Sequence, residues 1–191
     1  MAEVCTYIES ELSDSQIESI VTLTNSIWPK EELTLRQRID QTSATIRDES
    51  RATINPIRFV IWDGGQAIAH ALVFDRLVRS LDETNKPTST INVLALAAVC
   101  SDAKRRGQGL GLAVVKAAFE QIGDQKPLSL FQTGVPQFYE KLGGRIVNNQ
   151  FVNLLNDKDQ KANPWWDKEV MIVPGNFEWP EGRIDLNGAG Y

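Results

Sequence analysis

A glycine-rich segment in the middle of the chain, Arg106-Gly107-Gln108-Gly109-Leu110-Gly111, has the composition of an anion-binding turn. It follows a β-prone run and precedes an apolar run with helical spacing. Glycines let a backbone approach an anion closely, and the unpaired N–H groups at the start of a helix attract negative charge. The segment therefore indicates a phosphate site. The alternative is an ordinary glycine-rich turn between a strand and a helix.

Two common phosphate-binding motifs do not fit this segment. The dinucleotide fingerprint needs G-x-G-x-x-G early in a strand–helix–strand unit, with an acidic residue about 20 positions later. This chain instead has G-x-G-x-G at mid-chain, preceded by basic residues. The P-loop string G-x-x-x-x-G-K followed by Ser or Thr does not occur in the sequence. The pattern that remains is R-x-x-G-x-G between a strand and a helix.

The elements that would position this segment alternate between strands and helices. Two capping boxes, Ser13 with Gln16 and Thr34 with Gln37, predict the starts of two helices. The predicted helices are 13–28, 34–48, 112–122 and 137–142, and the predicted strands are 4–8, 58–62, 67–77, 90–99, 128–131, 145–147 and 170–173. This order predicts an α/β layout around a mixed sheet.

The composition fits one domain in the cytoplasm. A length of 191 residues with 42% hydrophobic residues suits a single domain, 1–191, with residues 174–191 as a tail packed on it. No window approaches the roughly 18–20 apolar residues of a membrane span, and the acidic N-terminus does not resemble a signal peptide. Cys5 and Cys100 lie too far apart in sequence for a disulfide framework or a metal motif, so we predict no metal.

The charge balance argues against nucleic acid as a partner. The formal net charge is −5, whereas an extended nucleic-acid surface is basic. An acidic protein suits a small cationic partner such as an amine. We therefore predict a small-molecule amine partner without nucleic acid or membrane, and leave a homodimer open.

A second string makes the glycine-rich segment more specific. Residues 137–144, Q-F-Y-E-K-L-G-G, are similar to the F-Y-E-K-L-G-F segment of the GNAT superfamily of acyl-CoA N-acyltransferases, with Gly144 in place of the usual Phe. Both strings occur in the superfamily's order, separated by one predicted helix and one predicted strand. The resemblance covers roughly residues 58–147. It implies an α/β (α+β) fold with a mixed, mostly antiparallel central sheet, helices on both faces and a V-shaped splay between the two central strands.

The resemblance implies acetyl-CoA as the cofactor. In such proteins the splayed strand pairs with the pantetheine arm, which assigns this role to the backbone of Ala97, Ala98 and Val99. The diphosphate contacts would come from Arg106, Gly107, Gly109, Leu110, Gly111 and Leu112. The link over residues 100–105 is longer than in the family, so Arg105 could share the role of Arg106.

The implied reaction is direct attack of a neutral amine on the thioester carbonyl. A backbone N–H near Ala97 would stabilise the oxyanion, and Tyr139 matches the tyrosine that protonates the leaving thiolate. Many relatives place a Glu at about Ala95, but this strand has no carboxylate. His70, the only histidine, could act as the base because its ordinary pKa is near 6.5. It could equally be a hydrogen-bonded structural histidine.

The acceptor is less well defined. The tail from Trp179 to Tyr191 is loosely similar to that of the aminoglycoside 2'-N-acetyltransferases. By this likeness, Asp185 and the terminal carboxylate of Tyr191 would bind an ammonium group, with Trp165, Trp166 or Trp179 as an apolar wall. The alternative is a tail that only covers the sheet. The acceptor could be a polyamine, an amino sugar or an amino-acid-like amine.

The sequence thus predicts an acetyl-CoA-dependent N-acetyltransferase acting on a primary amine. One alternative is a degenerate GNAT protein that binds acyl-CoA as a sensor or regulator without catalysis, because the strand carboxylate is missing. Another is an acyltransferase for a longer acyl chain, since the small side chains of Ala95 and Ala97 would leave room for it.

Overall fold

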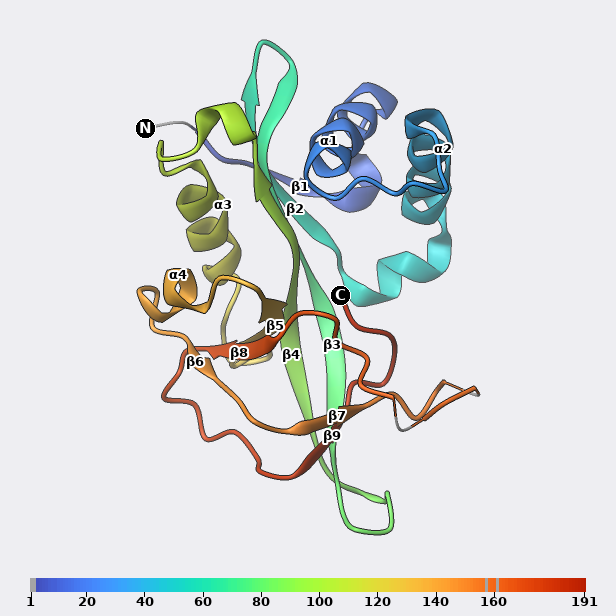
Figure 1. Ribbon diagram of the computed structural model, residues 1–191, viewed down its shortest axis with the longest axis vertical. Helices are drawn as coiled ribbons and strands as arrows, with labels where there is room; N and C mark the ends of the chain where they lie inside the picture. The colour runs from blue at the N-terminus through green and yellow to red at the C-terminus, as the bar shows by residue number, and fades with distance from the viewer. Residues whose placement is uncertain (1–2, 157, 161) are drawn as a thin grey trace. The chain divides into compact units, whose positions relative to one another are not determined.

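The computed structural model describes residues 3–156, 158–160 and 162–191. Its helices are α1 (Asp14–Ile27), α2 (Leu35–Arg47), α3 (Leu110–Phe119) and α4 (Pro136–Glu140), and its 3-10 turns are η1 (Glu9–Glu11), η2 (Glu49–Ile54) and η3 (Ala103–Arg105). The strands are β1 (Cys5–Ile8), β2 (Ile57–Asp63), β3 (Gln66–Leu81), β4 (Pro87–Ser101), β5 (Ser129–Thr133), β6 (Arg145–Ile146), β7 (Gln150–Val152), β8 (Glu169–Val173) and β9 (Arg183–Asp185) (Figure 1).

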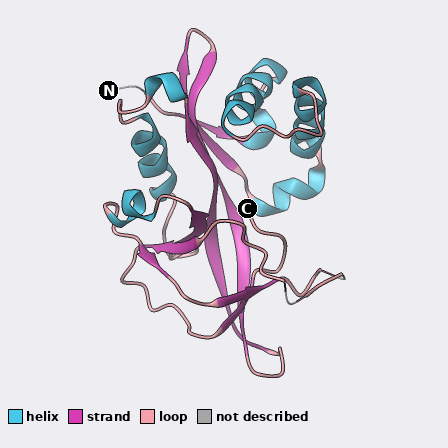
Figure 2. Cartoon of the chain, viewed as in Figure 1, coloured by secondary structure: helices cyan, strands magenta, loops and turns pink. Residues whose placement is uncertain are grey.

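The sheet is mixed and mostly antiparallel, as the resemblance implied. Its strands pair in the order β1-β2-β3-β4-β5-β8-β6, and β9 pairs with both β3 and β7. The pairs β1–β2, β2–β3, β3–β9, β5–β8 and β6–β8 are antiparallel, whereas β4–β5 and β7–β9 are parallel. The two longest strands are β3 and β4 (Figure 2).

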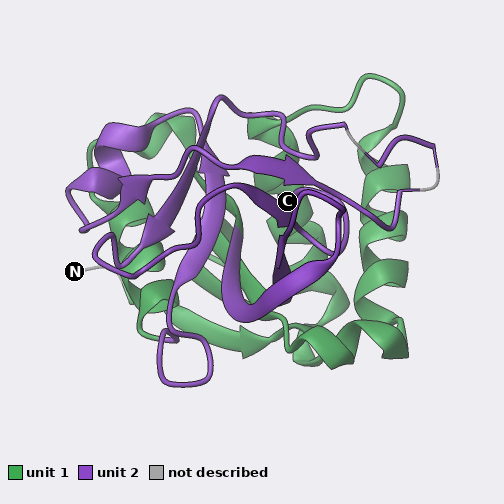
Figure 3. Ribbon diagram, turned by 90° about the horizontal axis from the view of Figure 1, so that it is seen from below, with its two compact units in different colours: residues 1–74, 97–120 green, residues 75–96, 121–191 purple. Residues whose placement is uncertain are grey.

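The chain forms two compact units, each built from two segments (Figure 3). Unit 1 comprises residues 1–74 and 97–120, and unit 2 comprises 75–96 and 121–191. Strands β3 and β4 pass from one unit into the other, so the boundary does not fall in a linker. Our assignment of a single domain over 1–191 stays a prediction.

Unit 1 contains β1, β2, α1, α2 and α3. Both capping boxes form: the side chain of Ser13 accepts from the Gln16 N–H, and that of Thr34 accepts from the Gln37 N–H. The apolar faces of α1 and α2 share a core with Val60, Ala67 and Cys100. Figure 1 shows α3 and the α1–α2 pair on opposite sides of the strands of this unit.

Unit 2 has its own core, to which the C-terminal tail contributes. The buried cluster includes Leu130 of β5 and Trp165, together with Trp179, Ile184 and Leu186 from the tail. Strand β9 joins the sheet through the register Arg79↔Asp185 and through β7. The tail is therefore part of this core.

The strands differ from the sequence prediction in two places. First, β3 continues to Leu81 and β4 begins at Pro87, so both strands are longer than the predicted strands 67–77 and 90–99. Their turn is tightened by Asp82, whose carboxylate accepts from the backbone N–H groups of Thr84 and Lys86. Second, β7 and β9 were not predicted, because three residues are too few to display a strand period. None of the helices in the described part of the chain is long and apolar enough to cross a bilayer.

Candidate functional site

The glycine-rich segment forms a turn whose backbone leads directly into α3. Gly107 and Gly109 have φ values of +81° and +75°, in the left-handed region that favours glycine. Gly109 is the N-cap of α3, and its carbonyl accepts from the Ala113 N–H at 3.0 Å. No side chain caps the helix. The first-turn N–H groups therefore have no partner within the helix and are available to an anion.

Open space lies beside this turn. A Cβ atom added at Gly107, Gly109 or Gly111 would meet no atom within 4 Å. Gly111 is notable because it is helical and has no positive φ. Neither the packing of the protein nor the local backbone requires glycine there, although glycine is less favourable than alanine in a helix by about 1 kcal/mol. The absence of a side chain fits a site that receives a bulky anion at close range.

The two arginines before the turn have different surroundings. The guanidinium of Arg105 forms an ion pair with the Asp63 carboxylate. Arg106 is exposed and, among the described residues, forms no ion pair. The extra residues of this link fold into η3, where Asp102 accepts from the Lys104 N–H at 3.0 Å. Arg106 is therefore the arginine whose charge is not neutralised by a protein carboxylate, while Arg105 is engaged by Asp63.

The part of β4 assigned to pantetheine is irregular. Ala97, Ala98 and Val99 are half-buried, and Ala98 has φ +50°, which is uncommon for a residue with a side chain. The defined register between β4 and β5 comprises Leu94↔Ser129 and Ala95↔Leu130. Strand β5 continues to Thr133 in register with β8. Within the described residues, the pairing of β4 with β5 is therefore short. This agrees with the predicted splay, in which β4 and β5 separate after Ala95.

His70 lies in the structure as a hydrogen-bonded structural histidine. This corrects the first of our two alternatives, in which His70 acts as the base. It is fully buried. Its Nδ1 lies 2.8 Å from the Ala98 carbonyl oxygen, and its Nε2 lies 3.0 Å from Nη1 of Arg58. Burial, followed by the positive charge of Arg58, lowers the pKa of His70 to about 3. Both nitrogens are engaged and the imidazole is a very weak base, so it cannot serve an exposed acceptor amine.

Glu9 lies at the other end of this hydrogen-bonded group. Its buried carboxylate accepts from Nε of Arg58 at 2.8 Å and from Nη2 of Arg51 at 3.2 Å. Burial by itself raises the pKa of Glu9, but the hydrogen bonds and charges of Arg51 and Arg58 outweigh it and lower the pKa. No local pattern of residues could reveal this cluster, because Glu9 and Arg58 are 49 positions apart.

The buried histidine makes the stability of the protein depend on pH. The unfolded chain binds a proton at His70 below about pH 6.5, whereas the folded chain does not do so until about pH 3. The free energy of unfolding should therefore fall as the pH decreases from 6.5 towards 3. Between pH 7.5 and 5.0, we expect a loss of about 2 kcal/mol from this group. Urea unfolding of the wild type and of His70→Asn at pH 7.5 and pH 5.0 measures this loss of stability. An equal loss in both proteins would contradict the lowered pKa of His70.

Tyr139 lies in α4 within an aromatic cluster of unit 2. Its ring centroid is 4.4 Å from that of Phe131 and 4.8 Å from that of Phe138, and the residue is buried. Burial, followed by the charge of Asp167, raises the pKa of Tyr139. The phenol therefore keeps its proton at neutral pH, as a proton donor must. The catalytic role of Tyr139 stays a prediction.

Asp185, one of the three predicted acceptor residues, is unsuitable, which corrects that part of the assignment. Asp185 is fully buried, and its Oδ1 accepts from the N–H groups of Leu154 and Asn187, each at 3.0 Å. The hydroxyl of Tyr191 donates to the Leu130 carbonyl at 3.0 Å, and its ring packs against Trp165. Oδ2 of Asp185 is also buried and lies 3.7 Å from Nη1 of Arg79, so this carboxylate is not accessible to an ammonium ion. A terminal carboxylate oxygen of Tyr191 accepts from Nε2 of Gln132 at 2.8 Å, and its role towards an acceptor stays a prediction. These contacts hold the tail in place.

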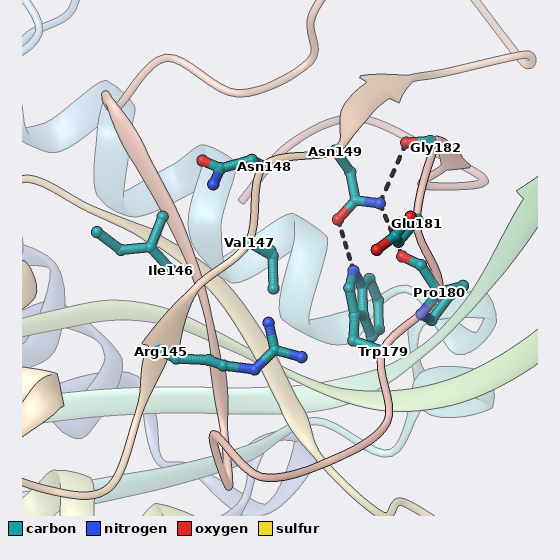
Figure 4. A pocket seen from close by; sticks show the side chains of 9 residues that line it. All are labelled: Arg145, Ile146, Val147, Asn148, Asn149, Trp179, Pro180, Glu181 and Gly182. Atoms are coloured by element: carbon teal, nitrogen blue, oxygen red, sulfur yellow. Dashed lines mark hydrogen bonds between the residues drawn. The ribbon is translucent and has the colours of Figure 1, made fainter.

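Trp179 lines a cavity of about 420 Å³ in unit 2 (Figure 4). Its indole N–H donates to Oδ1 of Asn149 at 2.6 Å. The amide of Asn149 donates in turn to the carbonyls of Pro180 and Gly182. These polar groups satisfy one another, so they shape the wall of the cavity without offering free groups. Among the described residues, no cluster of His, Cys, Asp and Glu side chains is arranged to hold a metal ion.

The comparisons with known proteins identify the fold. No family model and no curated protein matches the sequence. An acyl-CoA N-acyltransferase from Pseudomonas aeruginosa matches with a TM-score of 0.55 and 14% identity, over 90% of this chain and 99% of that chain. ElaA from Escherichia coli matches with a TM-score of 0.54 and 17% identity, over 90% of this chain and 99% of that chain. An acetyltransferase from Trypanosoma brucei matches with a TM-score of 0.53 and 18% identity, over 76% of this chain and 95% of that chain. This chain therefore has the fold of the GNAT acyl-CoA N-acyltransferases, as the two sequence strings implied.

Proposed function

We propose that the protein is an acetyl-CoA-dependent N-acetyltransferase that transfers an acetyl group to a primary amine of a small molecule. The observation that carries the proposal is the uncapped start of α3 after Gly107 and Gly109, with open space at Gly111. Main-chain N–H groups at such a turn suit a diphosphate. The fold is one on which solved acyl-CoA N-acyltransferases are built.

The residues of unit 1 fit the cofactor in a consistent way. Arg106 and the N–H groups from Gly107 to Leu112 would hold the diphosphate, and the backbone of residues 97–99 would pair with the pantetheine. When bound, acetyl-CoA supplies an activated thioester. The chain then has to orient that thioester, stabilise the oxyanion and supply a proton to the thiolate. We assign the last task to Tyr139, following the resemblance.

In this proposal the enzyme acts in the cytoplasm, and its acceptor is a small cationic molecule. The acidic net charge favours approach of a polyamine, an amino sugar or an amino-acid-like amine. Strand β4 has no carboxylate at Ala95, and His70 is engaged inside unit 1. The amine therefore has to enter largely neutral or lose its proton to water.

The diphosphate assignment predicts opposite effects of Gly111→Ala on stability and on binding. Without ligand, alanine should raise the free energy of unfolding by up to about 1 kcal/mol, because it is a better helix former and its methyl group meets nothing. With CoA, the methyl group should obstruct the anion and weaken binding about tenfold or more. Calorimetric titration with CoA and urea unfolding measure the two effects.

Gly123→Ala is the matched control, since a Cβ there also meets no atom within 4 Å and the residue lies beyond the other end of α3. It should leave CoA affinity unchanged. Wild-type protein that shows no increase in melting temperature with millimolar CoA would overturn the proposal, because a ligand of the native state stabilises it. Unchanged affinity in Gly111→Ala would remove the diphosphate from this turn.

A second function is favoured by one observation. The absence of a carboxylate on β4, together with the engaged His70, fits a protein that binds acyl-CoA as a sensor or regulator without catalysis. Thiol release from acetyl-CoA with a panel of amines separates the two functions. Release above the background rate, abolished by substitution of Tyr139, would exclude the regulatory alternative.

A further inference from the structure

A hydrogen-bonded chain of side chains connects η1 to the irregular part of β4. The Glu9 carboxylate accepts from Arg58, Nη1 of Arg58 lies 3.0 Å from Nε2 of His70, and Nδ1 of His70 lies 2.8 Å from the Ala98 oxygen. Arg58 and His70 are diagonal neighbours on β2 and β3, since Val60 is opposite His70. All these residues belong to unit 1.

The chemistry of the partners fixes the state of the imidazole. An arginine can only donate, so Nε2 of His70 must accept. A carbonyl oxygen can only accept, so Nδ1 of His70 must carry the proton and donate to Ala98. Neutral histidine with the proton on Nδ1 satisfies both bonds, and no other state does. The charge of Glu9 orients Arg58, and Arg58 thereby selects the tautomer that bonds to the strand.

Ala98 is the residue that needs such support. Its φ of +50° costs a residue with a side chain on the order of 1–3 kcal/mol, and such conformations persist only where the surroundings impose them. The hydrogen bond from His70 reaches the carbonyl of this same residue. The buried chain therefore lies where it can hold the left-handed turn of the strand.

The planarity of the peptide bond carries this constraint to the next residue. In a trans peptide, the C=O of one residue and the N–H of the following residue point in opposite directions. Because the Ala98 carbonyl is fixed towards His70, the Val99 N–H is directed away from it. Val99 is half-buried and lies beyond the printed register of β4 with β5, which comprises Leu94 and Ala95, so on the β5 side this N–H can face a ligand lying along β4.

We propose that the Glu9–Arg58–His70 chain positions the Ala98–Val99 peptide so that the Val99 N–H binds the thioester carbonyl of acetyl-CoA. His70 is a positioning residue in this scheme, since it acts through the backbone and does not touch the substrate. The inference rests on the proposed function and adds a residue that sets the orientation of its carbonyl-binding group.

The test compares two ligands that differ at the carbonyl. Acetyl-CoA has the carbonyl oxygen, and S-ethyl-CoA lacks it. Without an amine, calorimetric titration of the wild type should give about two- to tenfold tighter binding of acetyl-CoA, the size of one net hydrogen bond. His70→Leu should bind both ligands with the affinity of S-ethyl-CoA for the wild type, within about twofold.

Two further variants separate positioning from general damage. His70→Asn keeps an N–H donor near the place of Nδ1 and should restore a large part of the preference for acetyl-CoA. His70→Gln places its amide near Nε2 and should not restore it. In turnover assays, kcat should fall about tenfold or more in His70→Leu and His70→Gln, with the KM for the amine nearly unchanged. If His70→Leu does not fold, the Asn and Gln pair carries the comparison.

The outcomes can be told apart. Wild-type protein that binds neither ligand would overturn the proposed function itself. Wild-type binding with an unchanged preference in His70→Leu and His70→Gln would overturn the positioning role alone. A parallel loss of affinity for both ligands, or equal behaviour of the Asn and Gln variants, would reduce His70 to a packing role and also overturn it.

Discussion

Glu9→Gln is expected to lower the free energy of unfolding by about 3–5 kcal/mol, the cost of removing one partner of a buried ion pair. Glu9 is fully buried, and it is the carboxylate paired with both Arg58 and Arg51. The side chain of Arg58 is only 7% exposed, so its charge would remain inside unit 1 without a counter-charge. Urea unfolding at pH 7.5, followed by tryptophan fluorescence, measures the change.

An exposed ion pair provides the matched control for this substitution. Arg36 and Asp40 lie 3.0 Å apart on α2, with side chains that are 74% and 57% exposed. Asp40→Asn should therefore cost no more than about 0.5 kcal/mol. The double variant Glu9→Gln with Arg58→Met should lose less than the sum of the two single variants, because it no longer leaves the Arg58 charge unpaired. A Glu9→Gln cost as small as that of the control would contradict the burial of this cluster.

Local patterns explain which parts of the fold could be predicted. The capping boxes at Ser13 and Thr34 depend on residues three positions apart, so the sequence alone located both helix starts. Strand β9 depends on pairing with β3 and β7, which are distant in sequence. No local pattern of three residues can reveal such a partner, and the strand was missed for that reason.

The same distinction applies to the candidate functional residues. The turn at Gly107 and Gly109 was predictable because positive φ values and a helix start are local properties. Asp185 was assigned wrongly because a carboxylate near aromatic residues can bind a ligand or accept from the backbone, and only the fold shows its N–H partners. For His70 the sequence left two alternatives. Arg58 and Ala98 decided between them, and neither contact has a signature in the sequence.

Tyr139→Phe is expected to lower kcat by about 10²- to 10⁴-fold, the range for loss of a positioned proton donor. Phenylalanine keeps the ring that packs on Phe131 and Phe138, so unfolding by urea and the affinity for CoA should change little. The raised pKa of Tyr139 keeps the phenol protonated through neutral and mildly basic pH. The wild-type rate should therefore show no loss of a tyrosine proton below about pH 10.

Tyr7→Phe is the appropriate control, because Tyr7 is likewise a tyrosine with a raised pKa but lies in β1, where its hydroxyl accepts from the indole N–H of Trp62. Its loss should cost about 1 kcal/mol of stability and leave kcat unchanged. Equal kcat values for the wild type and Tyr139→Phe, with turnover clearly measurable, would show that water or the amine itself supplies the proton to the thiolate. The proposed acetyltransferase function would then stand without Tyr139, since the proposed diphosphate contacts and the proposed orientation of the thioester do not depend on that hydroxyl.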